Sequence, residues 1–364
     1  MIKKKIDKLR ELIKLHNLDG YVIPKNDAYF SEFSRPDRLK TISNFTGSAG
    51  FAIVLKKENF LFVDGRYTIQ ASQEVDSNQY QIFNYKDKSI FDLLSEIVKV
   101  KDVIGFDGNI EKFKKIEILQ RKLGNGIKIK PVISNLIDLI WKDRPKKLIS
   151  SPFKLPLNFH GEDELIKIKK IIRHIKINKK YAYLSESCDS ICWLFNIRAQ
   201  DLEYSPLIMA KSIIHKDGNC FIFSDQKNLK NETLSNKIKI IYKPIKHFDT
   251  HFSKYKDSIK SYLCAPNETS FNTIMSIKKM GAKFTFKENI IDILKATKNK
   301  TEENGMRNAH IRDGVALTRF IYWIKNTKSY PQTEVSASNY LDNLRIKNKN
   351  FFSLSFPTIA GSGP

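Results

Sequence analysis

A chain of 364 residues, of which 41% are hydrophobic, is long enough for two or three packed domains and differs from the composition of disordered proteins. Its formal net charge of +24 comes from evenly spread basic residues without zinc-finger spacing or an arginine-rich stripe, so no specific nucleic-acid partner is predicted. The apolar runs stay far below the ~20 residues of a membrane span, which predicts a soluble protein with no membrane partner.

The first part of the chain, over residues 1–148, is expected to form an α/β domain. Its first segment, 2–16, carries apolar residues at helical spacing: Ile2, Ile6, Leu9 and Ile13. A strand follows at once, which favours an ordinary first helix over a targeting or membrane-surface helix. The further expected elements are a strand over 20–24, a short helix near 39–45, a hairpin over 51–63 and a buried strand over 103–107. This alternation predicts the α/β class.

The second part, over 160–298, repeats the plan of the first after a proline-containing linker. The expected elements are a long helix from Glu162, a strand over 181–184, a helix over 190–195 and a strand-turn-strand over 207–223. Because their order and spacing match those of 20–63, we infer two related α/β modules in tandem, each with a mixed sheet. Neither copy carries a catalytic constellation, which favours a scaffold or interface role.

The last part, over 299–364, begins with a strong helix from 302 to 325, for which Thr301 is the expected N-cap. Apolar residues along this helix predict a buried stripe, and Gly314 within it suggests close packing against another element, which could be one that this chain lacks. A strand is expected over 351–359. A helix and one strand form no core, so we expect a domain whose remainder this chain lacks.

Few residues in this sequence suggest catalytic or metal chemistry. His247, Asp249 and His251 lie within five residues and could bind Zn²⁺. A zinc site needs another rigid ligand, and a Lys-rich amphipathic pattern follows, so this segment is interpreted as the exposed start of a helix. The four cysteines form no Cys-x-x-Cys pair. Without a signal-peptide pattern they favour a reduced, cytoplasmic compartment.

One turn carries charged residues at the end of an expected strand, namely Asp64, Arg66 and Tyr67. Functional residues often gather at strand ends and on loops, so these side chains could line a cleft. A local ion pair between Asp64 and Arg66 around a tight turn is the alternative interpretation. The sequence leaves both open.

Six segments together resemble the aminopeptidase P family, the Xaa-Pro aminopeptidases of the cytosolic three-domain type. They cover nearly the whole chain in the order of that family and lie at 45–50, 64–67, 139–145, 189–198, 305–317 and 354–364. The resemblance implies two creatinase-N-like domains followed by a pita-bread catalytic domain. That domain holds two divalent metals, usually manganese, on two Asp, one His and two Glu. The metals activate a water that attacks the peptide bond before a proline at position two.

The resemblance also implies that this chain lacks the catalytic machinery. In the family every metal ligand lies beyond the Gly-Pro at 363–364, so no residue here matches a catalytic or metal-ligating position, and no cofactor is expected on this chain. His310 lies in the opening helix, outside that ligand set. The residues expected to line a cleft or interface are Asp64, Arg66, Tyr67, Arg198 and His310.

Three functional interpretations follow from this resemblance. The first is the N-terminal part of an Xaa-Pro aminopeptidase, truncated at the start of its pita-bread domain and itself inactive. The second is a non-catalytic interaction or assembly module. The third is one half of a split metallopeptidase completed by a second chain. The implied partners are a second copy of the chain, a complementary C-terminal chain and, for full-length members, proline-containing peptides.

Overall fold

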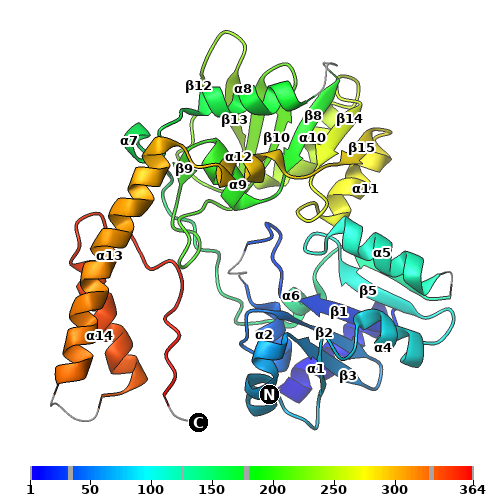
Figure 1. Cartoon of the computed structure of the whole chain (residues 1–364). Helices are drawn as coiled ribbons and strands as arrows, with labels where there is room; N and C mark the ends of the chain where they lie inside the picture. The colour runs from blue at the N-terminus through cyan, green and yellow to red at the C-terminus, as the bar shows by residue number, and fades with distance from the viewer. Residues whose placement is uncertain (1, 32–35, 125, 176–179, 328–331, 363–364) are drawn as a thin grey trace.

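The computed structural model describes residues 2–31, 36–124, 126–175, 180–327 and 332–362. Two α/β modules lie one above the other, and a helical hairpin near the C-terminus extends away from them (Figure 1). No helix in these ranges is long and apolar enough to cross a membrane.

The first module contains a six-stranded mixed sheet. Its strand order is β4-β3-β2-β1-β5-β6. The strands are β1 (Gly20–Pro24), β2 (Gly50–Leu55), β3 (Asn59–Val63), β4 (Gln81–Asn84), β5 (Val103–Asp107) and β6 (Lys128–Val132). The pairs β1–β2 and β2–β3 are antiparallel, whereas β3–β4, β1–β5 and β5–β6 are parallel.

Helices cover both faces of this sheet. One face is covered by α1 (Ile2–Leu15), α2 (Arg38–Ser43), α3 (Thr68–Glu74) and α6 (Leu136–Ile140), and the other by α4 (Ile90–Ile97) and α5 (Phe113–Leu123). Ile6, Leu9 and Ile13 of α1 are fully buried against the sheet. The basic N-terminal segment is therefore an ordinary core helix, as the sequence favoured.

The second module repeats this sheet. Its order is β12-β13-β11-β10-β8-β14-β15, which matches the first sheet strand for strand apart from the added edge strand β12. The strands are β8 (Tyr181–Ser185), β10 (Ala210–His215), β11 (Asn219–Ser224), β12 (Glu232–Thr233), β13 (Lys239–Lys243), β14 (Ser261–Cys264) and β15 (Lys283–Phe286). The shared order confirms two related α/β modules in tandem.

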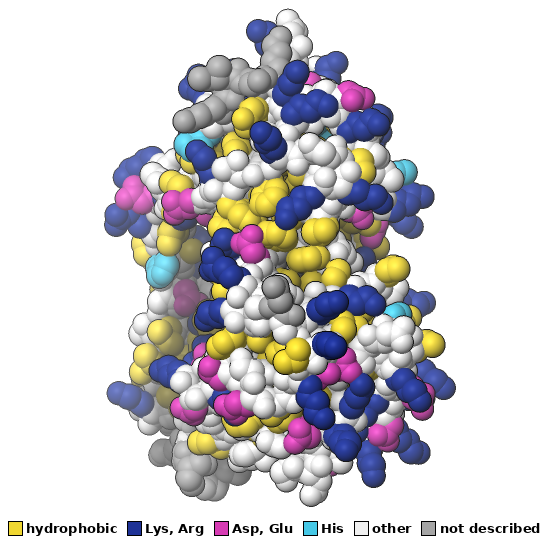
Figure 2. Space-filling model, turned by 90° about the vertical axis from the view of Figure 1, so that its right-hand side faces the viewer, with side chains coloured by type: hydrophobic (Ala, Val, Ile, Leu, Met, Phe, Trp, Pro, Cys, Tyr) yellow, Lys and Arg dark blue, Asp and Glu magenta, His cyan; other side chains and the backbone are white. Residues whose placement is uncertain are grey.

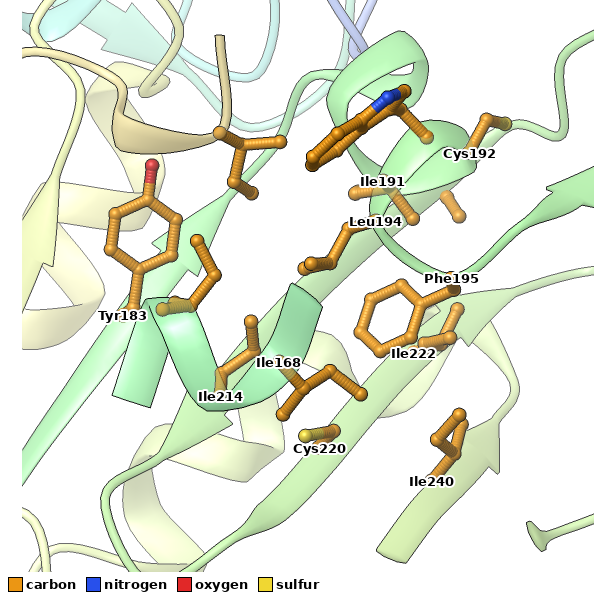
Figure 3. Packing of buried hydrophobic residues seen from close by; sticks show 14 of the residues in the cluster. Ile168, Tyr183, Ile191, Cys192, Leu194, Phe195, Ile214, Cys220, Ile222 and Ile240 are labelled. Carbon is orange, nitrogen blue, oxygen red and sulfur yellow. The ribbon is translucent and has the colours of Figure 1, made fainter. Parts of the chain in front are cut away.

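The second core also has helices on both sides. One face packs against α8 (Glu164–His174), α9 (Cys188–Leu194) and α12 (Ile290–Ala296), and the other against α10 (Phe248–Lys254) and α11 (Phe271–Lys279). Figure 3 shows Ile168, Ile191 and Leu194 of the first group lying over Ile214 and Ile222 of the sheet. A two-stranded ribbon of β7 (Phe153–Lys154) and β9 (Ile197–Arg198) and the short helix α7 (Leu157–His160) flank this core.

The two modules contact each other through matching loops after β5 and β14. The Phe113 N–H donates to the Thr269 carbonyl (3.0 Å), and the Phe271 N–H donates to the Glu111 carbonyl (2.8 Å). The ring centroids of Phe113 and Phe271 lie 5.6 Å apart. Figure 2 shows the face that carries α5 and α11, on which apolar side chains gather across the middle among many Lys and Arg groups. Backbone bonding and aromatic packing thus join the modules.

The C-terminal part forms a helical hairpin of α13 (Lys300–Asn326) and α14 (Glu334–Ile346). The Trp323 and Tyr340 rings stack with centroids 3.9 Å apart, and Arg345 pairs with Asp313 at 2.7 Å. The strand expected over 351–359 is wrong, because residues 351–362 form no strand in the structure. An apolar run becomes a strand only where a neighbouring strand pairs with its N–H and C=O groups.

Candidate functional site

The charged turn after β3 is a local ion pair. Arg66 Nε lies 2.8 Å from Asp64 Oδ1, and the same carboxylate accepts the Arg66 backbone N–H at 3.0 Å. These bonds hold the pKa of Asp64 below its usual range. The Tyr67 hydroxyl is hydrogen-bonded to the Ser48 hydroxyl (2.7 Å). The structure therefore contains the local pair that the sequence offered as an alternative, and a cleft role for Asp64, Arg66 and Tyr67 stays a prediction.

Arg198 lies far from that turn, on β9 of the second module. Its guanidinium donates to the backbone carbonyls of Cys192 and Ile197, the latter at 2.9 Å. Burial lowers the pKa of Arg198, while the nearby thiol of Cys192 and carboxylate of Glu302 oppose that shift. Arg198 thus belongs to the polar cluster at the base of α13.

This α13 base cluster consists of Lys167, Trp193, Asn196, Arg198 and Glu302. The Trp193 indole N–H donates to Glu302 Oε1 (3.1 Å), and Lys167 Nζ donates to the Trp193 carbonyl (2.9 Å) and to Asn196 Oδ1 (2.6 Å). The Lys167 ammonium also lies 4.1 Å from the centre of the Trp193 ring. Burial lowers the pKa of Lys167 to about 8. The cluster attaches the first turn of α13 to the second module.

Asn299, rather than the expected Thr301, is the N-cap of α13. Its side-chain oxygen accepts the Thr301 and Glu302 N–H groups at 2.9 and 3.0 Å, and its amide donates to the His160 carbonyl at 2.7 Å. Asparagine caps a helix start at least as well as threonine, and here it also binds the preceding module. The direction of α13 is therefore fixed at its N-terminal end.

Beyond its base, α13 is largely exposed. Ala316 alone is buried along α13, all of whose residues are described. The apolar side chains that are exposed on the hairpin are Met306, Ile311, Val315, Leu317, Ile321, Tyr322, Ile324, Val335 and Ile346. The expected stripe is buried only in part: Ala316 is buried and Trp323 packs against Tyr340 of α14, whereas Met306, Val315 and Ile324 are exposed. Gly314 has no neighbouring atom within 4 Å of a built Cβ, so the described residues provide no element that packs closely against it.

His310 lies on the exposed part of α13. Its Nδ1 is hydrogen-bonded within the helix to the Met306 carbonyl (2.8 Å). Figure 1 shows α13, which carries His310, extending away from the first module. An interface role for His310 stays a prediction.

The sequence did not reveal a buried ion pair in the second module. Glu186 is fully buried and forms a salt bridge with Lys211, which is also nearly buried. The same carboxylate accepts the Ser270 N–H (2.7 Å) and the Thr273 hydroxyl (3.0 Å). These bonds satisfy a buried charge and hold the loop after β14, which contacts the first module. The signal that could have revealed it is a glutamate placed directly after a buried strand.

In the histidine segment His251 is buried, whereas His247 and Asp249 are exposed. His251 lies inside α10 with its Nε2 atom 3.0 Å from His215 Nε2 on β10. Burial lowers the pKa of His215 to about 4 and that of His251 to about 3, so both imidazoles are neutral at pH 7. The expected exposed start of a helix holds for His247 and Asp249, whereas it is wrong for His251, which lies on the face of α10 that meets the sheet. His247 and Asp249 lie outside this pair.

A polar cavity of about 310 Å³ lies where the two modules meet the start of the linker. Arg38 binds Asp138 through two hydrogen bonds of 2.8 and 2.9 Å, and Arg144 binds the same carboxylate at 2.8 Å. Lys211 reaches the cavity from the second module. Both arginines are paired with Asp138, and these ion pairs in the cavity wall join α2, α6 and the linker.

The side chains present do not fit a dinuclear metal centre. In the described ranges, no group of three or more His, Cys, Asp or Glu residues is placed to hold a metal ion. The His215–His251 pair is enclosed by Phe221 and Tyr255.

Comparisons with known proteins agree with this architecture. Residues 5–139 and 143–302 each match a Creatinase/Prolidase N-terminal domain family. The chain is 30% identical to a probable Xaa-Pro aminopeptidase P of Pyricularia oryzae over 99% of this chain and 62% of the relative. For a probable Xaa-Pro aminopeptidase P of Laccaria bicolor, the identity is again 30%, over 99% of this chain and 58% of the relative.

A solved structure gives the same result. The X-prolyl aminopeptidase of Caenorhabditis elegans, described as a cytosolic enzyme with a di-nuclear active site, superposes with a TM-score of 0.91 at 26% identity. The match covers 99% of this chain and 62% of that one, so the chain spans less than two thirds of the length of these relatives. The two modules of this chain are creatinase/prolidase N-terminal domains, and along nearly its whole length the chain is similar to Xaa-Pro aminopeptidases P.

Proposed function

We propose that this chain is the N-terminal scaffold of an Xaa-Pro aminopeptidase and does not hydrolyse peptides by itself. The observation that carries the proposal is the match to the C. elegans enzyme, which extends over 99% of this chain, including the helical hairpin, yet over 62% of that enzyme. The lack of a suitable metal-ligand group among the described residues supports the same division of roles. Catalysis then depends on a part that carries two divalent metals and takes proline-containing peptides.

The hairpin of α13 and α14 is the proposed docking surface for that catalytic part. Its exposed apolar side chains include Ile311 and Tyr322, which are 66% and 72% exposed. Burying one large apolar side chain fully contributes ~1.5–3 kcal/mol, so covering several of them would favour binding strongly. The α13 base cluster holds this surface at a fixed angle to the second module. The catalytic part can be on the same polypeptide or on a second one.

A purely non-catalytic assembly module is the alternative. The exposed hairpin supports this alternative equally, because several exposed apolar side chains on one helical hairpin are typical of an interaction surface. Association of two copies of this chain also stays a prediction. The cytosolic description of the C. elegans enzyme supports a cytoplasmic location for this chain.

An activity assay tests the proposal. The purified chain is incubated with Mn²⁺ and an Xaa-Pro-containing peptide, with and without the C-terminal part of the P. oryzae relative that this chain does not match. We expect no release of the first residue by the chain alone and chelator-sensitive release after the addition. Chelator-sensitive release by the chain alone would contradict the proposal. Binding of the added part without activity would favour the assembly module.

A further inference from the structure

A network of polar side chains in the second module holds three carboxylates against one ammonium group. The carboxylates belong to Asp189 at the start of α9, Glu268 in the loop after β14 and Asp292 in α12. Lys295 of α12 forms salt bridges with Asp189 and with Asp292, the latter at 3.1 Å. Glu268 Oε2 instead accepts the neutral side-chain amide of Asn289 (2.7 Å). One ammonium cannot balance three carboxylates, so at least one carboxyl group gains from keeping a proton.

The hydrogen bonds of Asp292 indicate that Glu268 holds this proton. Glu268 and Asp292 share a side-chain hydrogen bond. Since an ionised carboxylate has no hydrogen to donate, this bond exists only while one of the two carboxyl groups holds a proton. The Ser190 hydroxyl donates to Asp292 Oδ1 (2.8 Å) and the Lys295 ammonium lies 3.1 Å from the same atom, which favours the ionised form of Asp292. Glu268 is therefore the donor of the shared bond.

The surroundings of Glu268 favour its neutral form. Burial is the largest cause, and the negative charges of Asp292 and Asp189 act in the same direction, so the pKa of Glu268 rises to about 7 despite the hydrogen bond from Asn289. From β8, the Tyr183 hydroxyl donates to Asn289 Oδ1 (2.7 Å), and burial raises the pKa of Tyr183, so this hydroxyl stays neutral. A carboxyl group that gains or loses its charge near neutral pH thus binds the start of α12.

Glu268 is also next to the contact between the two modules. The carbonyl of the following residue, Thr269, accepts the Phe113 N–H of the first module (3.0 Å), and Lys112 forms a β-bridge with Ser270. Burial lowers the pKa of Lys112, whereas the charge of Glu268 opposes that shift across the contact. This attraction is outweighed by burial and the neighbouring carboxylates, because the pKa of Glu268 is raised overall. The loop 265–270 thus binds α12 through Glu268 and the first module through its backbone.

We propose that Glu268 is a pH-sensitive switch that controls how tightly the two modules are held together. With its proton, Glu268 donates to Asp292 and fixes the loop 265–270 against α12, which keeps the Thr269 carbonyl in place for the Phe113 N–H. Without its proton, Glu268 repels Asp292, the shared hydrogen bond is lost and the loop separates more easily from α12 and from the first module. The proposal rests on this network and on the module contact, and it does not depend on the proposed aminopeptidase function.

Amide hydrogen exchange of the whole chain measures the switch at Phe113, whose N–H forms the bond to Thr269. Opening of the loop returns Glu268 to its ordinary pKa of 4.5, so a rise in pH from there to about 7 favours the open loop, and the effect is complete above that range. After correction for the intrinsic dependence of exchange on pH, we expect protection of the Phe113 amide to fall about tenfold between about pH 5.5 and about pH 7.5.

Three variants separate the switch from a general effect of pH. Glu268→Gln cannot ionise and still donates to Asp292, so it should lose the tenfold change and keep the protection of low pH. Glu58→Gln, the same substitution at an exposed glutamate of the first module, should retain the change. Asp292→Asn removes the repelling charge and should move the upper end of the pH range of this change at least about one unit lower. Protection of Phe113 that does not depend on pH, or an equal pH dependence in Glu268→Gln and in the unchanged chain, would overturn the proposal.

Discussion

Adding one methyl group at Gly108 should loosen the contact between the two modules. Gly108 is buried in the loop after β5, and a Cβ built there would lie 2.1 Å from Oδ1 and 2.7 Å from Cγ of Asn272 in the second module. Contacts this short cannot persist, and the asparagine side chain is too short to move its end away freely. Gly108→Ala must therefore displace Asn272 or separate the loops.

The size of the effect follows from the bonds that Asn272 makes. Its N–H donates to the Gly108 carbonyl (2.9 Å), and its side-chain amide donates to Asn109 Oδ1 (3.0 Å). At ~0.5–1.5 kcal/mol for each bond, losing both weakens the contact by about 1–3 kcal/mol. Gly314→Ala is the matched control, because that glycine lies exposed in α13 with no atom nearby. There the same methyl should stabilise the helix by ~0.5–1 kcal/mol.

Urea unfolding and amide hydrogen exchange measure both changes. We expect Gly108→Ala to lower the unfolding midpoint and to speed exchange at the Phe113, Phe271 and Asn272 amides, while Gly314→Ala leaves these amides unchanged. An unchanged midpoint together with unchanged exchange at Asn272 in Gly108→Ala would refute the idea that this loop contact needs a glycine.

Three further predictions concern burial and the linker. Burial depresses the pKa of His215 to about 4 and that of His251 to about 3. The contribution of the two neutral imidazoles to the free energy of unfolding should therefore be complete above pH ~6.5 and fall toward pH 3–4, by up to ~1.4 kcal/mol per pH unit for each imidazole. His251→Phe should make this fall in stability at acid pH shallower in urea titrations, and an identical slope would contradict the assignment. Lys167→Met leaves the Trp193 carbonyl and Asn196 Oδ1 at the base of α13 without their donor and should destabilise the chain by ~1–3 kcal/mol in thermal unfolding. No change in stability would mean that the cluster does not anchor the helix. Limited trypsin digestion should cut first within 146–160 or after Lys298, and early cuts within 20–65 would contradict the proposed domain boundaries near 148, 160 and 298.

Much of the fold could be predicted from local patterns. The hairpins of both modules combine apolar strand runs with short polar turns, and these signals are complete within about a dozen residues. The repetition of this plan correctly predicted two related sheets, because the strand order of one module then applies to the other. The amphipathic spacing of α1 likewise identified its buried face.

The errors came from regions whose structure depends on distant partners. The strand expected over 351–359 has the right composition but no neighbouring strand to pair with. The stripe on α13 is apolar at helical spacing, yet spacing alone cannot reveal whether anything covers it. The Lys-rich pattern that follows His251 predicts an exposed start of a helix, whereas the contact with His215 on β10 makes His251 a core residue.

The candidate sites were less predictable than the fold. The Asp64–Arg66 pair is local and could be foreseen as an alternative. The Glu186–Lys211 pair joins residues that lie 25 positions apart in the sequence, so no spacing pattern indicates it. Only the folded chain brings these groups together.

Amide hydrogen exchange on α13 tests the scaffold proposal most directly. It compares residues 305–325 with the hairpins over 51–63 and 207–223, in the chain alone and after addition of the catalytic part of an aminopeptidase P. The exposed helix should exchange much faster than the two hairpins in the chain alone and should slow markedly when the catalytic part binds. Slow exchange of 305–325, equal to that of the hairpins in the monomeric chain alone, would contradict the account.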